Sequence, residues 1–510
     1  MAHGTEPPIP VMSANPLQGL GEAEKRVLSY AASMGKEFDW SVLLAASETD
    51  EEQLAEILER LVHLGILREL NWGDSYAFAQ VVTLAQAYSE ISSSRLRVIH
   101  KKIAEAYEKQ YPEPTPDIIP EMGRQFHLGR VHEKSLPYNR YAAALAANAF
   151  SPDIAVRYLE RAKEDLEALP GDHRLEEADV LKEMGEMYDA MGNDARADEL
   201  YGESLRKLPE GEVILRALIL LSRADAARVM DRIGPAHQYC EEAIRLLEKA
   251  GHKKGLALAH RNLARTAYLQ ERYELGRKEI EATLSFLDPE KDAKDVARCS
   301  IEFGNLLSSM PDPADQARGV EYYYQAIQAL ETQRDYRELA RAYTSLAVAL
   351  LNSHPGEAVA NLEKARTAAE KCKDMRLVGW TLFNTVEPLI ALNRGPEAAQ
   401  NNAEARRVLS KVNDQLGLQQ VALNDGIIAQ HQKSFEESEK AYMESLKQAE
   451  GLDYARTVAE VLVHLAMMYA DWGRVDEAMK VIARTKETGE DHIDPVVRLS
   501  YEALKRRLGT

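Results

Sequence analysis

The chain has 510 residues, enough for about three to five ordinary domains or for one long array of repeats. It carries 63 Lys+Arg and 82 Asp+Glu, so its formal net charge is −19, which argues against a nucleic acid or an anionic membrane as the main partner. The three cysteines are far apart, which excludes a disulfide framework or a cysteine-built zinc site and fits the cytoplasm. No apolar run approaches the roughly 18 residues of a membrane span.

Residues 1–20 are rich in proline and are expected to form a flexible arm, and residues 21–92 carry no long repeat. Helix caps and alternating apolar runs predict a compact module there. The expected elements are helices at Glu22–Met34, Asp39–Ala46 and Glu51–Leu64 and strands at Ile66–Leu70 and Tyr76–Ala79. A turn signal, Asn71–Asp74, separates the two strands. Three helices followed by a two-stranded wing predict a winged-helix domain.

The charges of this module argue against DNA binding. Residues 1–115 hold ten Lys+Arg and seventeen Asp+Glu. The third helix, which would enter a major groove, begins Asp50-Glu51-Glu52 and would place carboxylates against phosphates. We therefore expect a packing domain that fixes the start of the C-terminal part of the chain, with connecting helices at 93–134.

From residue 135 to residue 490 the sequence repeats with a period close to 40 residues. A small residue recurs at Ala155, Ala197, Ala236, Gly276, Gly319, Ala358, Ala398, Ser438 and Ala478. A second small residue follows each of these seven positions later, and a larger one usually stands between them, on the same helix face. A further small residue precedes most units by about twelve positions, with Val386 as the bulky exception. The pattern predicts about nine stacked helix–turn–helix units.

This pattern resembles the tetratricopeptide repeat. The unit at Leu181–Pro209 matches the family consensus at the positions Leu181, Met184, Gly185, Tyr188, Ala197, Tyr201, Ser204 and Pro209. The long period is similar to that of maltose-regulator-type activators and of signal-transducing (STAND-type) ATPases. Residues 34–80 also resemble the winged-helix domain of those ATPases. The resemblance implies an all-α, right-handed superhelical solenoid after a small winged-helix domain. The C-terminal segment, 491–510, is expected to form a helix that caps the last repeat.

Motifs for catalysis are missing from the sequence. No G-x-x-x-x-G-K-[ST] phosphate loop is present, so this chain lacks the catalytic module of the ATPases that it resembles. Three interpretations stay open: a stand-alone regulator, a subunit that meets an ATPase in trans, or a chain that begins after the ATPase domain. There is no H-E-x-x-H, and His127 and His132, five positions apart, would not share a helix face. We expect no enzyme activity, no cofactor and no metal.

A partner is expected on the concave face, lined by the first helix of each unit. The position two before the upstream small residue is polar throughout, and it resembles the asparagine ladder with which superhelical tetratricopeptide proteins hold an extended peptide. The predicted groove residues are Arg261, Asn262, Arg265, Arg298, Asn305, Asn384, Asn424 and His464. Trp380 and Glu387 share a helix face with Asn384 and would either enter the groove or pack between repeats.

The sequence thus predicts a non-catalytic, cytoplasmic scaffold or regulatory subunit that binds a protein or peptide, without nucleic acid or membrane. Two alternatives remain: a transcription regulator whose winged helix binds DNA while the repeats sense a ligand, and an accessory subunit of a separate signal-transducing ATPase.

Overall fold

A computed structural model describes residues 17, 19–310, 312–452, 455–490, 493 and 495–509. The expected flexible arm, 1–20, lies almost entirely outside the described residues. The chain forms two compact units, Met1–Val180 (unit 1) and Leu181–Thr510 (unit 2). Among the helices that the structure describes, none combines the length and the hydrophobicity that crossing a membrane requires.

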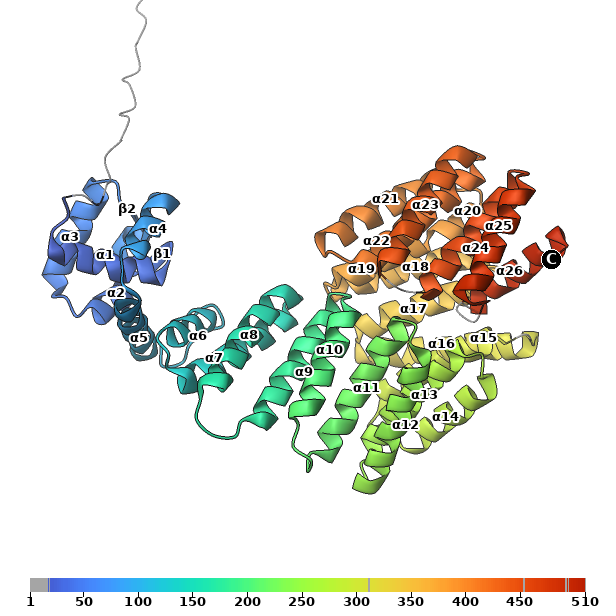
Figure 1. The fold of residues 1–510 in the computed structure, drawn as a ribbon, viewed down its shortest axis with the longest axis horizontal. Helices are drawn as coiled ribbons and strands as arrows, with labels where there is room; N and C mark the ends of the chain where they lie inside the picture. The colour runs from blue at the N-terminus through green and yellow to red at the C-terminus, as the bar shows by residue number, and fades with distance from the viewer. Residues whose placement is uncertain are drawn as a thin grey trace, which may run out of the picture. The chain divides into compact units, whose positions relative to one another are not determined.

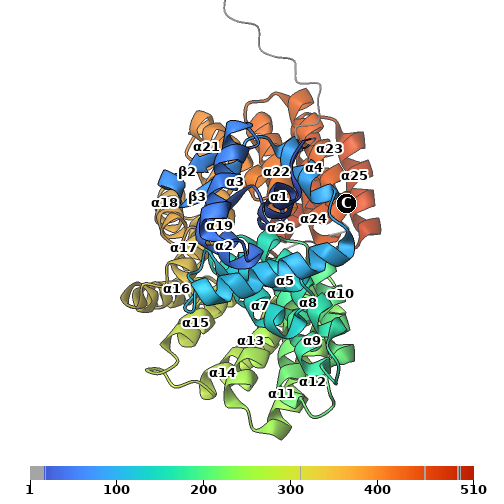
Figure 2. The same ribbon diagram turned by 90° about the vertical axis from the view of Figure 1, so that its left-hand side faces the viewer.

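Unit 1 begins with three helices and a small sheet, and Figure 2 shows β2 and β3 beside α3. The elements are α1 (Glu22–Met34), β1 (Glu37–Asp39), α2 (Trp40–Ser47), α3 (Glu51–His63), β2 (Leu67–Leu70), η1 (Asn71–Gly73), β3 (Ser75–Phe78) and α4 (Val81–Ser89). Asp50 caps α3 by accepting hydrogen bonds from the N–H groups of Glu52 and Gln53. The sheet has the antiparallel order β1–β3–β2. Strand β1 was missed because it has only three residues, too few for an alternating pattern.

The rest of unit 1 is helical. Its helices are α5 (Ser93–Gln110), α6 (Ile119–Leu128), α7 (His132–Asn148) and α8 (Pro152–Ala168), and α9 (Arg174–Ala190) crosses into unit 2. One apolar core extends from α1 through the small sheet to α6, where Phe126 is fully buried. The winged-helix assignment of the first part stays a prediction.

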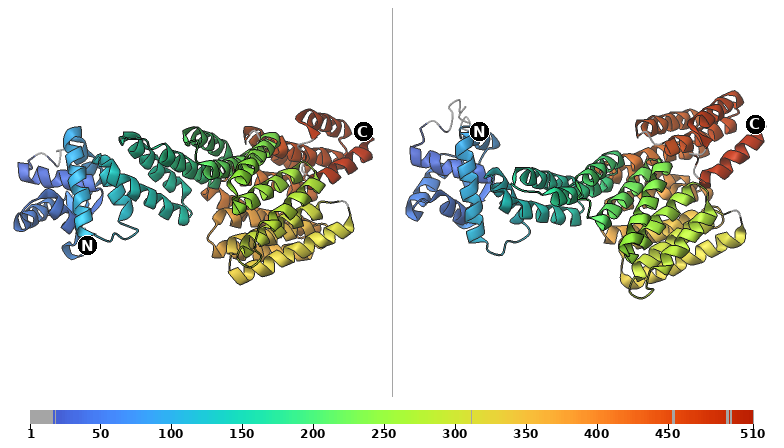
Figure 3. Two further views of the ribbon diagram at one scale, coloured as in Figure 1. Left: turned by 90° about the horizontal axis from the view of Figure 1, so that it is seen from below. Right: turned by 60° about the horizontal axis from the view of Figure 1, so that its bottom comes forward.

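Unit 2 consists of helical hairpins, which Figures 1 and 3 show as neighbouring antiparallel helices. The first are α10 (Asp194–Lys207), α11 (Val213–Val229), α12 (Ile233–Ala250), α13 (Lys253–Leu269), α14 (Tyr273–Ser285), α15 (Ala293–Ser308), α16 (Pro313–Gln333) and α17 (Tyr336–Leu350). The later ones are α18 (Pro355–Lys371), α19 (Met375–Asn384), α20 (Val386–Ala391), α21 (Gly395–Lys411), α22 (Gln415–His431), α23 (Phe435–Leu452), α24 (Ala455–Asp471), α25 (Val475–Thr488) and α26 (Pro495–Leu508).

The small residues of the repeat allow the two helices of a hairpin to approach closely. A Cβ atom on Gly185 would lie 2.6 Å from the ring of Tyr201, and one on Gly304 would lie 2.5 Å from the ring of Tyr323. Both tyrosines are at most 2% exposed. A glycine is therefore required opposite a tyrosine, whereas alanine stands opposite the smaller Leu, Ile or Cys of other repeats.

The unit with the bulky exception has a broken helix. Its first helix is divided into α19 and α20 at Thr385, just before Val386. Pro388 has no N–H, so it cannot donate the helical hydrogen bond to the carbonyl of Asn384. Asn384 and Glu387, on either side of this interruption, both border a cavity in unit 2.

Candidate binding cavity in the repeat unit

Unit 2 closes on itself through contacts between early and late repeats. Three arginines on α19, α24 and α26 reach residues at or near the turns that follow α9, α11 and α13. The pairs are Arg376 Nη1 with the Asp189 carbonyl oxygen (3.3 Å), Arg456 Nη2 with Asp231 Oδ1 (3.1 Å) and Arg498 Nε with Glu271 Oε1 (2.8 Å). These contacts span most of unit 2 in sequence, so its inner helices surround a common interior.

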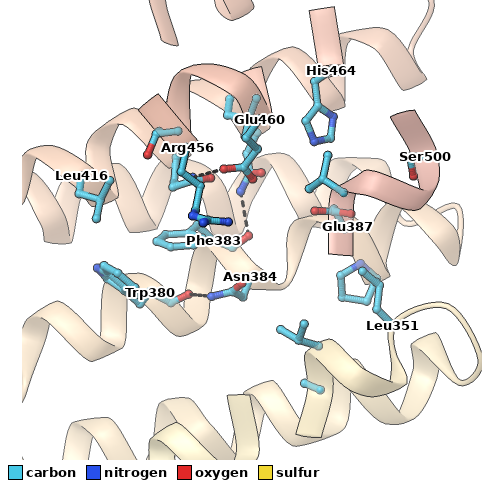
Figure 4. Close-up of a pocket in the computed structure, with 18 of the residues that line it drawn as sticks. Leu351, Trp380, Phe383, Asn384, Glu387, Leu416, Arg456, Glu460, His464 and Ser500 are labelled. Atoms are coloured by element: carbon cyan, nitrogen blue, oxygen red, sulfur yellow. Dashed lines mark hydrogen bonds between the residues drawn. The ribbon is translucent and has the colours of Figure 1, made fainter. Parts of the chain in front are cut away.

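That interior contains a cavity of about 580 Å³ (Figure 4). Its lining comes from α11, α13, α17–α20, α22, α24 and α26, which are mostly the first helices of their repeats. Its polar and aromatic lining residues include Arg228, Trp380, Phe383, Asn384, Glu387, Gln420, Asn424, Arg456, Glu460, His464 and Ser500. The volume lies within the range of roughly 300–1,000 Å³ that ligand sites occupy.

Two aromatic rings form an apolar wall of the cavity. The centroids of Trp380 and Phe383 lie 5.7 Å apart. The indole N–H of Trp380 donates to Asp414 Oδ2 at 2.7 Å, and Arg376 Nε donates to the same oxygen at 2.9 Å. Asp414 is 1% exposed and also caps α22 through Gly417 N. The tryptophan is therefore held in one orientation, with its polar atom satisfied and its ring available to a ligand.

Two ionisable groups that face the cavity have no charged partner among the described residues. Glu387 is exposed to the cavity but surrounded by protein, and this burial raises the pKa of its carboxyl group. Burial lowers the pKa of His464 to about 4, so its imidazole is neutral at pH 7. Figure 4 shows both side chains directed into the same space.

Amide side chains complete the polar lining. Asn384 Nδ2 donates to the Trp380 carbonyl at 2.8 Å, and Asn424 Nδ2 donates to the Phe383 carbonyl at 2.9 Å. Each side-chain amide thus donates one N–H to this chain's own backbone, and its oxygen remains available as a hydrogen-bond acceptor. Gln420 Nε2 donates to Glu460 at 3.0 Å, one repeat further along.

Three of the eight predicted groove residues, Asn384, Asn424 and His464, line this cavity. The other five lie on α13 and α15, away from the lining. Asn262 is only 2% exposed, and Asn305 accepts the hydroxyl hydrogen bond of Tyr323 at 2.7 Å. The structure therefore divides the predicted set between two environments, and a groove role for the five on α13 and α15 stays a prediction.

Two arginines of that second group, Arg265 and Arg298, form ion pairs with acidic residues of neighbouring repeats. Arg265 lies between Asp225 Oδ1 (3.0 Å) and Glu302 Oε1 (3.3 Å). Arg298 Nη2 lies 2.8 Å from Oε1 of Glu338, a side chain 6% exposed. Burial opposes the charge on Arg265, but the two carboxylates outweigh it and raise its pKa. We call Asp225, Arg265, Glu302, Arg298 and Glu338 the ion-pair ladder.

Sequence reasoning missed Arg228, Arg456 and Glu460 as cavity residues. These three residues reach the cavity only because distant repeats come together, which no local sequence pattern predicts.

No protein-family model matches the sequence, and no curated protein is detectably similar to it. Among solved structures, a Rap protein complexed with competence and sporulation factor is similar with a TM-score of 0.52 and 13% identity, over 71% of this chain and 99% of that one. A STAND protein with a tetratricopeptide repeat sensor from Pyrococcus horikoshii has a TM-score of 0.39 and 16% identity, over 85% of this chain. The present chain spans 64% of that protein's length. Yeast Tom70 has a TM-score of 0.37 and 12% identity, over 78% and 96% of the two chains.

The similarity to the Rap protein concerns the fold. Together with the hairpins of unit 2, it shows an all-α helical-repeat solenoid of the tetratricopeptide type. The maltose-regulator subtype and the winged helix stay predictions.

Proposed function

We propose that unit 2 is a non-catalytic binding module that encloses a short segment of another polypeptide in its cavity. The observation that supports this most is the cavity of about 580 Å³, which Trp380 and Phe383 wall and which the amide oxygens of Asn384 and Asn424 border. An extended peptide presents both N–H donors and apolar side chains, which match such a lining.

The lining also suggests the chemistry of the ligand. The Trp380 and Phe383 rings would receive an apolar or aromatic side chain. Glu387 lacks a cationic partner among the described residues and would accept a Lys, Arg or amino-terminal group. The Rap protein of similar fold is known in complex with competence and sporulation factor, which is compatible with a ligand enclosed by repeats.

The proposed role is regulatory binding in the cytoplasm, whether alone or beside a separate ATPase. Direct DNA binding by unit 1 is disfavoured, because Glu51, Glu52, Glu56 and Glu59 all lie on the exposed face of α3. In that proposal a winged helix at residues 21–92 and connecting helices at 93–134 precede and support the repeat array.

The test is to fill the cavity. Val348 lines it and is 42% exposed, so Val348→Trp would occupy ligand space without disturbing the core. Val475→Trp is the matched control, since Val475 is 48% exposed and lies on α25, outside the lining. Short random peptides would be selected by display on the whole wild-type protein, and binding of the enriched peptides would then be measured by fluorescence anisotropy.

We expect Val348→Trp to weaken those peptides at least about tenfold, roughly 1.4 kcal/mol, and Val475→Trp to leave them unchanged. Equal binding to wild type and Val348→Trp, or no enrichment at all, would overturn the proposal. Circular dichroism of both variants would establish that the fold is intact.

A further inference from the structure

A cluster in unit 1 brings two histidines and a buried aspartate together. His127 lies near the end of α6, His132 begins α7 and Asp165 lies on α8, and Figure 1 shows these helices as neighbours. His127 Nδ1 and His132 Nδ1 lie 2.8 and 2.7 Å from the same atom, Asp165 Oδ1. The three atoms all lie within 4.8 Å of one another.

The spacing of His127 and His132 predicts separate faces of one helix, whereas the structure places them on two helices, α6 and α7. Three residues, Gly129–Val131, form a turn between α6 and α7, and Arg130 takes a left-handed φ of 56°. A Cβ on Gly129 would lie 2.8 Å from the backbone nitrogen of Lys101, so only glycine permits this close approach. The turn reverses the chain direction, so that both imidazole rings contact Asp165.

Each of the two ring nitrogens of His127 faces a carboxylate oxygen. Its Nδ1 faces Asp165 Oδ1, and its Nε2 faces Glu164 Oε2 at 3.2 Å. A neutral imidazole carries one N–H, so one of its nitrogens would direct a lone pair at a carboxylate oxygen. A metal ion between His127 Nδ1 and Asp165 Oδ1 would accept that lone pair and leave the N–H on Nε2, facing Glu164.

We propose that His127, His132 and Asp165 bind a divalent transition-metal ion. Glu164 would accept the Nε2–H of His127, the carboxylate–histidine contact that commonly orients a metal-ligating imidazole through its other nitrogen. Asn139 Nδ2 lies 3.4 Å from Asp165 Oδ2 and would hold the aspartate from behind.

Two imidazole nitrogens and one carboxylate oxygen suit zinc and its first-row neighbours, whereas magnesium and calcium prefer oxygen ligands alone. Ligand atoms of a tetrahedral zinc lie roughly 3.3 Å apart, so each imidazole nitrogen would move away from Asp165 Oδ1 by about half an ångström on binding. The Asp165 side chain is fully buried, while those of His127 and His132 are 15% and 21% exposed, so the site borders solvent, from which a water could serve as fourth ligand. The ion would fasten the α6–α7 turn to α8.

Zinc binding by the whole chain tests this proposal. After removal of metals with a chelator, Zn²⁺ would be titrated by calorimetry, with Mg²⁺ as the comparison ion and thermal unfolding measured in parallel. We expect one Zn²⁺ per chain, a rise in melting temperature with Zn²⁺, and neither effect with Mg²⁺.

Three variants sharpen the test. His132→Gln removes a partly exposed ligand and should lower Zn²⁺ affinity at least tenfold, whereas His63→Gln, on the exposed surface of α3, should bind as wild type. Glu164→Gln keeps all three ligands and should weaken binding roughly tenfold, the size of such orienting contacts. Absence of Zn²⁺ uptake would overturn the proposal. Equal uptake by wild type and His132→Gln would overturn it as well.

Discussion

The polar residues on the inner helices of unit 2 have two different environments. Along α11, α13, α15 and α17, the ion-pair ladder joins each charged side chain to an opposite charge on a neighbouring inner helix. From α19 to α24, Glu387 and His464 occupy the inner surface without charged partners among the described residues and border the cavity. The repeat position that predicted a polar groove continues through both stretches.

The difference shows that a polar inner face is not sufficient for a binding site. In the ladder, charges such as Asp225 and Arg265 stand one period apart and satisfy each other when hairpins stack regularly. Around α19 and α20 no such pairing is present among the described cavity residues Glu387 and His464, and contacts from Arg376, Arg456 and Arg498 bring early and late repeats together around the cavity. Unpaired polar groups in an enclosed space are the ones available to a ligand.

Breaking the ladder should have the largest effect on stability. Arg298→Met would leave the carboxylate of Glu338, 6% exposed, without its near partner at 2.8 Å. We expect a loss of about 3 kcal/mol in the free energy of unfolding, measured by urea denaturation. Arg341→Met is the control, because Arg341 is 62% exposed and 3.9 Å from the same carboxylate, and it should cost less than about 0.5 kcal/mol. Comparable losses in the two variants would refute the ladder's role.

The unpartnered histidine should make stability depend on pH. The pKa of His464 is lowered to about 4 in the folded chain, against an ordinary value near 6.5. Below about pH 6.5 the unfolded chain takes up this proton while the folded chain does not, so stability falls as the pH drops toward 4. His464→Gln should remove about 2 kcal/mol of this fall, seen as a difference in unfolding free energy from wild type between pH 7 and pH 4. Parallel pH curves would contradict the assignment.

The cavity carboxylate should act in the opposite direction and more weakly. Because burial raises the pKa of Glu387, the folded chain binds its proton more tightly than the unfolded chain does. Its contribution is therefore most favourable at low pH and is lost as the pH rises through the folded pKa. Glu387→Gln should raise stability at pH 7 by at most about 1 kcal/mol, because water in the cavity screens the charge. A destabilised Glu387→Gln in urea denaturation at pH 7 would mean that the carboxylate has a cationic partner within the chain.

Much of the fold could be predicted because its signals are local. The 40-residue spacing of small residues, such as Gly185 and Gly304 opposite tyrosines, follows directly from helix packing. Helix α1 begins and ends where its caps predicted, at Glu22 and Met34. Val386, the bulky residue where a small one was expected, marks the site at which the inner helix breaks.

The site could be predicted only in part, because it depends on contacts across many repeats. Asn384, Asn424 and His464 were found from their repeat position, and the structure places them together. Arg265 and Arg298 carried the same kind of signal, but the acids that pair with them lie on neighbouring inner helices and could not be matched from sequence. The His127–His132 meeting was missed because a three-residue turn separates their helices.

Two asparagines at the same repeat position provide the finest test of the comparison. Asn384 borders the cavity and donates only to its own helix, so Asn384→Ala should change the free energy of unfolding by less than about 0.5 kcal/mol. The same change should weaken a cavity-bound peptide about fivefold, since one amide oxygen is lost as an acceptor. Asn262→Ala is the matched control: Asn262 is 2% exposed and outside the lining, so peptide affinity should stay unchanged. If anisotropy titrations showed the reverse order, the peptide would follow the helices of the ladder, and the cavity would not be its site.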